Sequence, residues 1–234
     1  MLHKTLASLL FLLSCCASAQ PSLSDSIKQI KPAIVAIGIH DPLGSPRIRL
    51  TGTGFVVADG KKVVTNYHVI APVLSSTGNQ SYVVLSGTGS AIKMHSITQT
   101  KTAPAYDLAV LSIDNALPTV RLADAAMAVE GTEVAFTGFP ITQVLGLYPA
   151  THRGIISAIT PIATPADNST QLQAAALRRL QQPYMVYQLD ATAYPGNSGG
   201  PLFDPVSGEV VGVVNMVMLK GARESALSQP SGIS

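Results

Sequence analysis

Short apolar runs rich in valine, isoleucine and aromatic residues alternate with glycine, proline, asparagine and aspartate along most of this chain. Runs of this length between turn-forming residues are typical of β-strands. Many short strands at close spacing favour barrels or a sandwich over alternating βαβ units, so we expect an all-β fold. The expected strands are Ala33–Ile39, Phe55–Ala58, Lys62–Thr65, Tyr82–Ser86, Leu108–Ile113, Glu133–Gly138, Gly154–Ile159, Met185–Leu189 and Glu209–Leu219.

Three segments break this pattern. Ser24–Lys31 predicts a short opening helix that is capped by Ser24 and Asp25. Leu117–Val129 has no clear strand and is expected to connect two halves of about 100 residues each. Ser169–Gln182 carries leucines and alanines near helical spacing. It is either a helical insertion that packs its leucine face on a barrel or a loop that faces a substrate or another subunit.

The first 19 residues have the features of an export signal. A positive start at Lys4, an apolar run at Leu6–Leu13 and small residues at Ala17-Ser18-Ala19 follow one another in the order of a secretory signal peptide. We therefore expect residues 1–19 to be removed. A second interpretation is a bacterial lipobox ending at Cys15, which would then carry a lipid anchor.

Composition limits the functions that the chain can have. The hydrophobic share is 47% and the charged share is 12%, against a usual charged share of about 25%, which argues against disorder. A net charge of +2 without a basic block offers no track for phosphates, so we exclude nucleic acid as a partner. No later apolar run reaches the ~18 residues of a membrane span.

Cysteine usage argues against disulfides and metal. Both cysteines, Cys15 and Cys16, lie in the leader, so the exported chain is expected to hold neither a disulfide nor a thiolate zinc site. No cluster of histidine, cysteine and carboxylate has ligand spacing, so we expect no metal and no other cofactor. An exported chain without disulfides favours a bacterial envelope over an animal secretion.

A glycine-rich turn around one serine carries the strongest chemical signal. In the segment GNSGGP, glycines on both sides of Ser198 permit a tight turn with positive φ. Such a turn can expose the hydroxyl and aim the amides of Gly196 and Ser198 at one point, with Asn197 between them, as an oxyanion hole. An ordinary glycine–serine loop is the alternative interpretation of this segment taken alone.

Two further segments supply partners for such a serine. The run VVTNYHV delivers His68 at the end of a β-branched strand, and an imidazole is a suitable base for a serine hydroxyl near neutral pH. The run YDLAVL places Asp107 at the start of an apolar strand. An aspartate there is often only a turn residue, but beside a catalytic histidine it would hold the imidazole tautomer.

The three segments, in the order His68, Asp107, Ser198, resemble the trypsin-like serine endopeptidases, and most of all the HtrA/Deg branch of bacterial envelope proteases. The resemblance runs from about Ile34 to the end of the chain and is specific because three motifs occur together. It also includes the segments Thr51–Phe55, Gly131–Pro140 and Gly154–Ile159.

The resemblance implies two six-stranded antiparallel β-barrels with an active site between them. The protease domain would span 20–234, with barrel one at about 33–116 and barrel two at about 130–234. In the implied mechanism Ser198 attacks the scissile carbonyl, His68 transfers the proton and Asp107 orients His68. The expected function is that of an exported serine endopeptidase, periplasmic or secreted, that acts on proteins or peptides.

The implied specificity pocket carries no charge. Its floor would be Thr192 and its walls Val214, Asn215 and Met216, so we expect cleavage after small to medium uncharged residues. The chain departs from the branch in two ways: no PDZ domain follows, and Ser231–Ser234 end inside a block that the family continues. Either the sequence is a fragment or the second barrel closes differently. A homo-oligomer is one possible assembly of the chain.

A second class of function remains: a catalytically weak or inactive binding or chaperone module on the same fold. A small-ester hydrolase is disfavoured because the chain has no Gly-x-Ser-x-Gly elbow. Reactivity of Ser198 discriminates the protease from the binding module.

Overall fold

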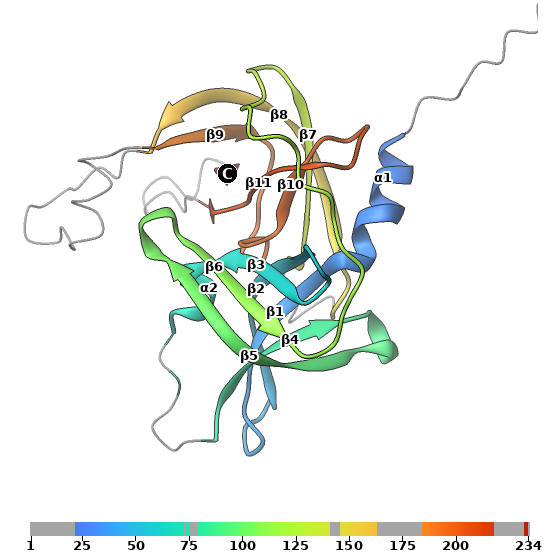
Figure 1. The fold of residues 1–234 in the computed structure, drawn as a ribbon, viewed down its shortest axis with the longest axis vertical. Helices are drawn as coiled ribbons and strands as arrows, with labels where there is room; N and C mark the ends of the chain where they lie inside the picture. Colours follow the sequence, from blue (N-terminus) through green and yellow to red (C-terminus); the bar gives the residue numbers. More distant parts are fainter. Residues whose placement is uncertain are drawn as a thin grey trace, which may run out of the picture.

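Six antiparallel strands close into a barrel in the first half of the chain. The computed structural model describes residues 22–72, 74, 79–140, 146–162, 184–217 and 232–233; the expected signal peptide and the expected helix at Ser169–Gln182 lie outside these ranges. The order around the barrel is β1-β2-β3-β6-β5-β4 (Figure 1). Its strands are β1 (Ile34–His40), β2 (Ile48–Val57), β3 (Lys62–Asn66), β4 (Ser81–Ser86), β5 (Lys93–Ala103) and β6 (Leu108–Ile113).

The second half forms a curled sheet in the order β11-β10-β7-β8-β9-β13-β12. No described residue pairs β11 with β12, so the described part of this sheet stays open. The architecture confirms the expected all-β fold of two barrel-like halves. The strands are β7 (Glu133–Gly138), β8 (Ala150–Pro161), β9 (Met185–Asp190), β10 (Pro201–Phe203), β11 (Val210–Val213), β12 (Met216–Val217) and β13 (Gly232–Ile233).

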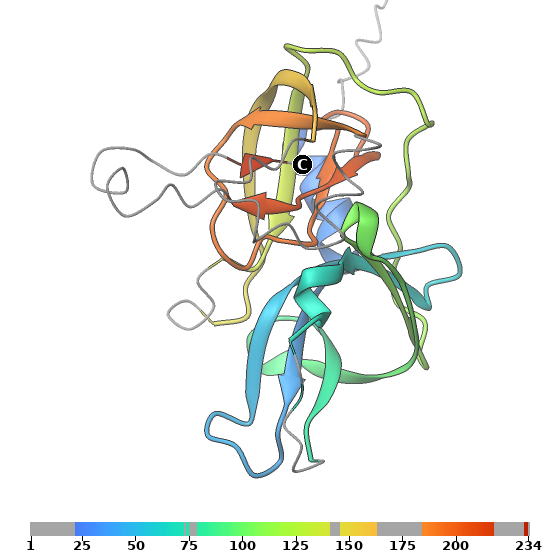
Figure 2. The ribbon, with the colours of Figure 1, turned by 90° about the vertical axis from the view of Figure 1, so that its left-hand side faces the viewer.

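The expected crossover at Leu117–Val129 is confirmed, because residues 114–132 contain no strand. Figure 2 shows this connection running along one side of the molecule from the closed barrel to the second sheet. It touches the second sheet through a parallel bridge between Leu122 and Val210. The described residues also form a short helix, α2 (Tyr67–Ile70), and three 3-10 turns, at Lys31–Ala33, Gly89–Ala91 and Pro104–Tyr106.

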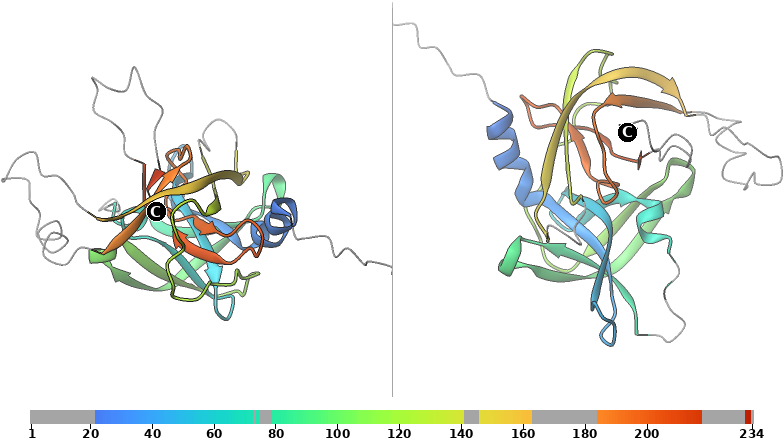
Figure 3. Two further views of the ribbon diagram at one scale, coloured as in Figure 1. Left: turned by 90° about the horizontal axis from the view of Figure 1, so that it is seen from above. Right: turned by 180° about the vertical axis from the view of Figure 1, so that it is seen from behind.

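Helix α1 (Leu23–Ile30) lies outside the second sheet and leads into β1 (Figure 3). Its cap is Ser22 rather than the expected Ser24, because Ser22 and Asp25 form a reciprocal capping box. The Ser22 hydroxyl and amide hold the pKa of the Asp25 carboxyl below its usual range. At its other end Ile30 is 1% exposed in the core, and the Ser26 hydroxyl donates to the Pro205 carbonyl at 2.9 Å.

Three strands, β5, β10 and β13, were not predicted, and the expected strand Glu209–Leu219 is divided into β11 and β12. β5 carries mostly polar and exposed residues, so no apolar run marks it, yet its hydrogen bonds to β4 and β6 complete the barrel. β10 is a three-residue strand directly behind the glycine-rich turn. The main core fills the first barrel and extends through Phe139, Phe203 and Val210 into the second sheet, so the two halves share buried surface.

Removal of the cap should weaken α1 without touching the core. We expect Ser22→Ala to lower the free energy of unfolding by about 0.5–2 kcal/mol, because the capping box loses the Ser22 hydroxyl that bonds the Asp25 amide and carboxylate. The measurement is urea denaturation of this variant and of a control, Ser81→Ala. Ser81 is an exposed strand residue, so its substitution should change stability by less than about 0.5 kcal/mol. Equal effects of the two substitutions would contradict the capping assignment.

Candidate active site

His68 and Asp107 form a short, well-aligned pair at one end of the closed barrel. His68 lies in α2, directly after β3, and Asp107 directly precedes β6, the strand that pairs with β3. His68 Nδ1 lies 2.7 Å from Asp107 Oδ2, and the His68 amide donates to Asp107 Oδ1 at 2.9 Å. The carboxylate side chain is 10% exposed and the imidazole 47% exposed. The buried acid therefore fixes one ring nitrogen while the ring remains open to a reactant.

The backbone around Asp107 is shaped to make this pair. Asp107 adopts the left-handed region with φ 53° and ψ 40°, which aspartate tolerates better than most residues. Its carbonyl accepts from the Tyr67 amide at 2.9 Å and from Asn66 Nδ2 at 3.1 Å. The aspartate is thus held by hydrogen bonds on both its main chain and its side chain, and each of these bonds comes from the segment that carries His68.

Ser198 lies on a tight turn of the second sheet. The Asn197 amide donates to the Tyr194 carbonyl at 3.0 Å, which closes a turn with Gly196 at φ +102°. After Ser198 the chain continues through Gly199, whose amide donates to the Val214 carbonyl at 2.8 Å. The half-buried Ser198 therefore follows a fixed turn on one side and precedes a fixed backbone bond on the other.

Glycine is required where this turn meets the closed barrel. Gly199 has φ +86°, and a Cβ there would lie 2.1 Å from the Thr53 carbonyl oxygen and 3.2 Å from the Asn66 amide nitrogen. A Cβ on Gly52 would lie 2.9 Å from the Ser198 carbonyl oxygen and 2.6 Å from Val69 Cγ2. The turn that carries Ser198 therefore packs against β2 and β3, close to the segment that carries His68.

The amides of Gly196 and Ser198 remain free. Neither donates a hydrogen bond to any acceptor among the described residues. The side chain of Asn197 between them is fully buried, and its amide atoms have no partner in that part of the chain. Two free donors beside a serine hydroxyl are the elements that an oxyanion hole needs.

The residues expected to line the specificity pocket lie in different environments. Thr192 and Asn215 are half-buried, whereas Val214 is fully buried in the core of the second sheet. Met216 lies in β12. Asn215 also borders a cavity of about 340 Å³ that reaches Asn66 and Tyr106, the neighbours of His68 and Asp107 in the chain. The residues that line this cavity are all uncharged.

Sequence reasoning did not single out Thr53, Asn66 or Tyr106 for the site. Asn66 Nδ2 donates to the Asp107 carbonyl, and the Tyr106 ring lies 5.2 Å from the tilted ring of Tyr184. Because such contacts join segments far apart in the chain, a single sequence carries no signal for them. Only their positions could have indicated a role, since Asn66 lies two residues before His68 and Tyr106 lies directly before Asp107.

A second serine–histidine pair lies elsewhere. Ser86 Oγ is 2.8 Å from His95 Nε2, but both residues are less than 10% exposed. His152 stacks on Phe136 at 5.0 Å, and burial holds its pKa below the usual range, so it is neutral near pH 7. Burial excludes a reactant from the first pair, and His152 is a packing residue.

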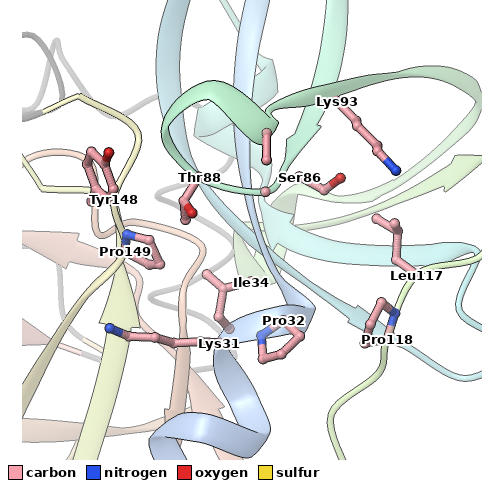
Figure 4. Close-up of a pocket in the computed structure, with 12 residues that line it drawn as sticks. Lys31, Pro32, Ile34, Ser86, Thr88, Lys93, Leu117, Pro118, Tyr148 and Pro149 are labelled. Atoms are coloured by element: carbon pink, nitrogen blue, oxygen red, sulfur yellow. The ribbon is translucent and has the colours of Figure 1, made fainter.

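A cavity of about 710 Å³ is lined by none of His68, Asp107 and Ser198 (Figure 4). Lys31 and Lys93 border it from opposite sides, and their ammonium groups do not converge. The described residues contain no group of three or more histidine, cysteine or carboxylate side chains that could hold a metal. Nor does any helix in those ranges have the length and apolar character needed to cross a membrane.

Comparison with known proteins identifies the family. The model of the trypsin-like peptidase domain matches residues 52–213, and the chain belongs to this family. A protein named probable periplasmic serine endoprotease DegP-like, from Halomonas elongata, is 32% identical over 182 residues, which cover 77% of this chain and 32% of the relative. Serine protease HTRA1A of Danio rerio is 29% identical over 205 residues, which cover 85% and 37%. The chain thus spans about a third of the length of these curated relatives.

Solved structures agree with this assignment. The active form of the Rv3671c protease from M. tuberculosis superimposes with a TM-score of 0.64 at 25% identity, covering 92% of this chain and 82% of that one. The HtrA-type protease AlgW, solved with a decapeptide, shares the fold with a TM-score of 0.61 at 24% identity, covering 91% and 63%. The expected resemblance to HtrA/Deg proteases is confirmed, and the chain belongs to the trypsin-like peptidase family.

The close contact between β2 and the turn that carries Ser198 should make the fold sensitive to a side chain at Gly199. We expect Gly199→Ala to destabilise the fold well beyond the ~1–2 kcal/mol of a positive φ, because its Cβ would overlap the Thr53 carbonyl. Gly131→Ala is the matched control, since Gly131 has φ +84° and no atom within 4 Å of the added Cβ. Urea denaturation of both variants gives the comparison, and equal losses would contradict the close approach.

Proposed function

We propose that this chain is an exported serine endopeptidase in which Ser198 is the nucleophile, His68 the general base and Asp107 the residue that orients His68. The observation that carries the proposal is the 2.7 Å contact between His68 and Asp107 at the edge of the barrel against which the Ser198 turn packs. Family membership supports the same reaction class.

The geometry supports a defined path for the proton. With Asp107 accepting from Nδ1–H, neutral His68 keeps the lone pair on Nε2 for the Ser198 hydroxyl. As Ser198 Oγ bonds to the scissile carbonyl carbon, its proton passes to Nε2 and the imidazolium is stabilised by Asp107. The imidazolium then protonates the leaving amine. Water repeats the sequence on the acyl-enzyme, which releases the acid product and restores Ser198.

The charge that develops on the carbonyl oxygen needs donors that are not already engaged. The amides of Gly196 and Ser198 meet this condition among the described residues. Because the turn is closed by the Asn197–Tyr194 bond before a substrate binds, these donors require little reorganisation during the reaction. Loss of one such donor typically costs about 10²–10³ in rate.

The proposed substrates are proteins or peptides with uncharged side chains before the scissile bond. Thr192, Val214, Asn215 and Met216 offer no charge to pair with lysine or arginine. The uncharged cavity beside Asn66 and Asn215 extends this character along the site. We propose that residues 1–19 direct export and that 20–234 form the protease domain; relatives named as periplasmic support this location.

Covalent labelling tests the proposal. We expect a fluorophosphonate probe to label the wild-type protein and casein to be cleaved, whereas Ser198→Ala should lose both. Asp107→Asn should reduce the rate by about 10⁴-fold, because the amide favours the wrong imidazole tautomer. Ser96→Ala, an exposed strand serine, is the matched control and should label as the wild type does.

The outcomes separate the two classes of function. Labelling that depends on Ser198 supports the protease. A folded wild-type protein that neither labels nor cleaves casein contradicts it and favours a binding module on the same fold.

A peptide library tests the specificity. We expect cleavage mainly after small to medium uncharged residues, because no carboxylate occupies position 192. Cleavage sites are identified by mass spectrometry, and a parallel digest of the library with trypsin is the control. A preference for arginine or lysine would contradict the proposed pocket.

A further inference from the structure

Thr53 joins the closed barrel to the nucleophile turn through its side chain and its backbone. It lies on β2 and is fully buried. Its hydroxyl donates to the Gly196 carbonyl at 2.6 Å and accepts from the Phe139 amide at 3.0 Å. Its amide donates to the Ser198 carbonyl at 2.8 Å. One residue of the first barrel therefore binds the carbonyls on both sides of Asn197.

These two carbonyls restrain the free amides through the Cα atoms of Gly196 and Ser198, because each amide lies in the peptide plane on the other side of the same Cα. The Gly196 carbonyl belongs to the peptide plane after Gly196 Cα, and the Ser198 carbonyl to the plane after Ser198 Cα. A peptide group is planar, so fixing these planes restricts rotation of the segment that carries the Gly196 and Ser198 amides. Thr53 itself is held, because its carbonyl accepts from the Thr65 hydroxyl at 2.6 Å.

Other groups near the turn, among the described residues, do not anchor the Gly196 carbonyl to the closed barrel. The Asn197 side chain is buried beside Gly138 but bonds to no described residue. The Asn197 amide closes the turn onto Tyr194, which belongs to the same loop and does not anchor it to the barrel. The side-chain anchor of the Gly196 carbonyl within the described residues is Thr53.

We propose that Thr53 is a positioning residue for the oxyanion hole: its hydroxyl holds the Gly196 carbonyl inward, so that the Gly196 and Ser198 amides face the reacting carbonyl. This inference rests on the proposed function. Without the hydroxyl, the Gly196 carbonyl and the Phe139 amide would be buried without partners. Rotation of the Gly196 peptide toward water would relieve this cost, and it would misplace the donors.

The test compares variants that differ by one hydroxyl. Thr53→Val keeps the shape and removes the donor, and Thr53→Ser keeps the donor. We expect Thr53→Val to lower kcat for a peptide substrate by about 10–100-fold, with KM changed less than about threefold. The affinity for a peptidyl trifluoromethyl ketone, which forms an oxyanion on Ser198, should fall in the same proportion. Thr53→Ser should recover kcat to within about threefold of the wild type.

The control removes an equally buried hydroxyl elsewhere. Thr137 is fully buried, and its Oγ1 lies 2.8 Å from Thr151 Oγ1 rather than against the turn. Thr137→Val should lower thermal stability but leave kcat within about threefold. If Thr53→Val does not fold, Thr53→Cys replaces it, since a thiol is a weaker donor of similar size. Its kcat should lie between those of the wild type and Ser198→Ala.

Each result has one meaning. Unchanged kcat in folded Thr53→Val or Thr53→Cys overturns the role of Thr53 and leaves the proposed function intact. Equal losses of kcat in Thr53→Val and Thr137→Val show a general loss of stability and also overturn the inference. A wild-type protein without activity that depends on Ser198 contradicts the proposed function itself.

Discussion

The active-site geometry depends on the close approach of two backbones, β2 of the closed barrel and the turn that carries Ser198. At Gly199 an added Cβ would lie 2.1 Å from the Thr53 carbonyl oxygen, and at Gly52 on β2 it would lie 2.9 Å from the Ser198 carbonyl oxygen. Only glycine permits such an approach. The Thr53 amide then reaches the Ser198 carbonyl at 2.8 Å. A side chain at either glycine would separate the two backbones, and with them Ser198 and His68.

The two halves contribute different things to the site. The closed barrel supplies a hydrogen-bonded frame in which paired strands β3 and β6 deliver His68 and Asp107 to the same end. The second sheet supplies a turn in which the Gly196 and Ser198 amides have no partner among the described residues, while the carbonyls of the same two residues accept from Thr53 on β2. Since the main core continues from the barrel into the second sheet through Phe139 and Phe203, packing also opposes separation of the halves.

The sequence predicted the strands with apolar runs, the crossover and the pairing of His68 with Asp107, because local patterns and a three-part motif mark them. It missed β5, whose polar residues face solvent, and it placed the cap of α1 at Ser24 instead of Ser22. Thr53 lies in the segment Thr51–Phe55, which supports the family resemblance but carries no local sign of a role for this residue. Its role depends on contacts with Gly196, 143 residues away, which no local pattern encodes.

A crystal structure of the fluorophosphonate adduct would test the account most directly. We expect the phosphorus bonded to Ser198 Oγ and one phosphoryl oxygen about 2.7–3.1 Å from the Gly196 and Ser198 amides, with His68 still bound to Asp107. An adduct on another residue would contradict the account, and so would a phosphoryl oxygen that points away from both amides.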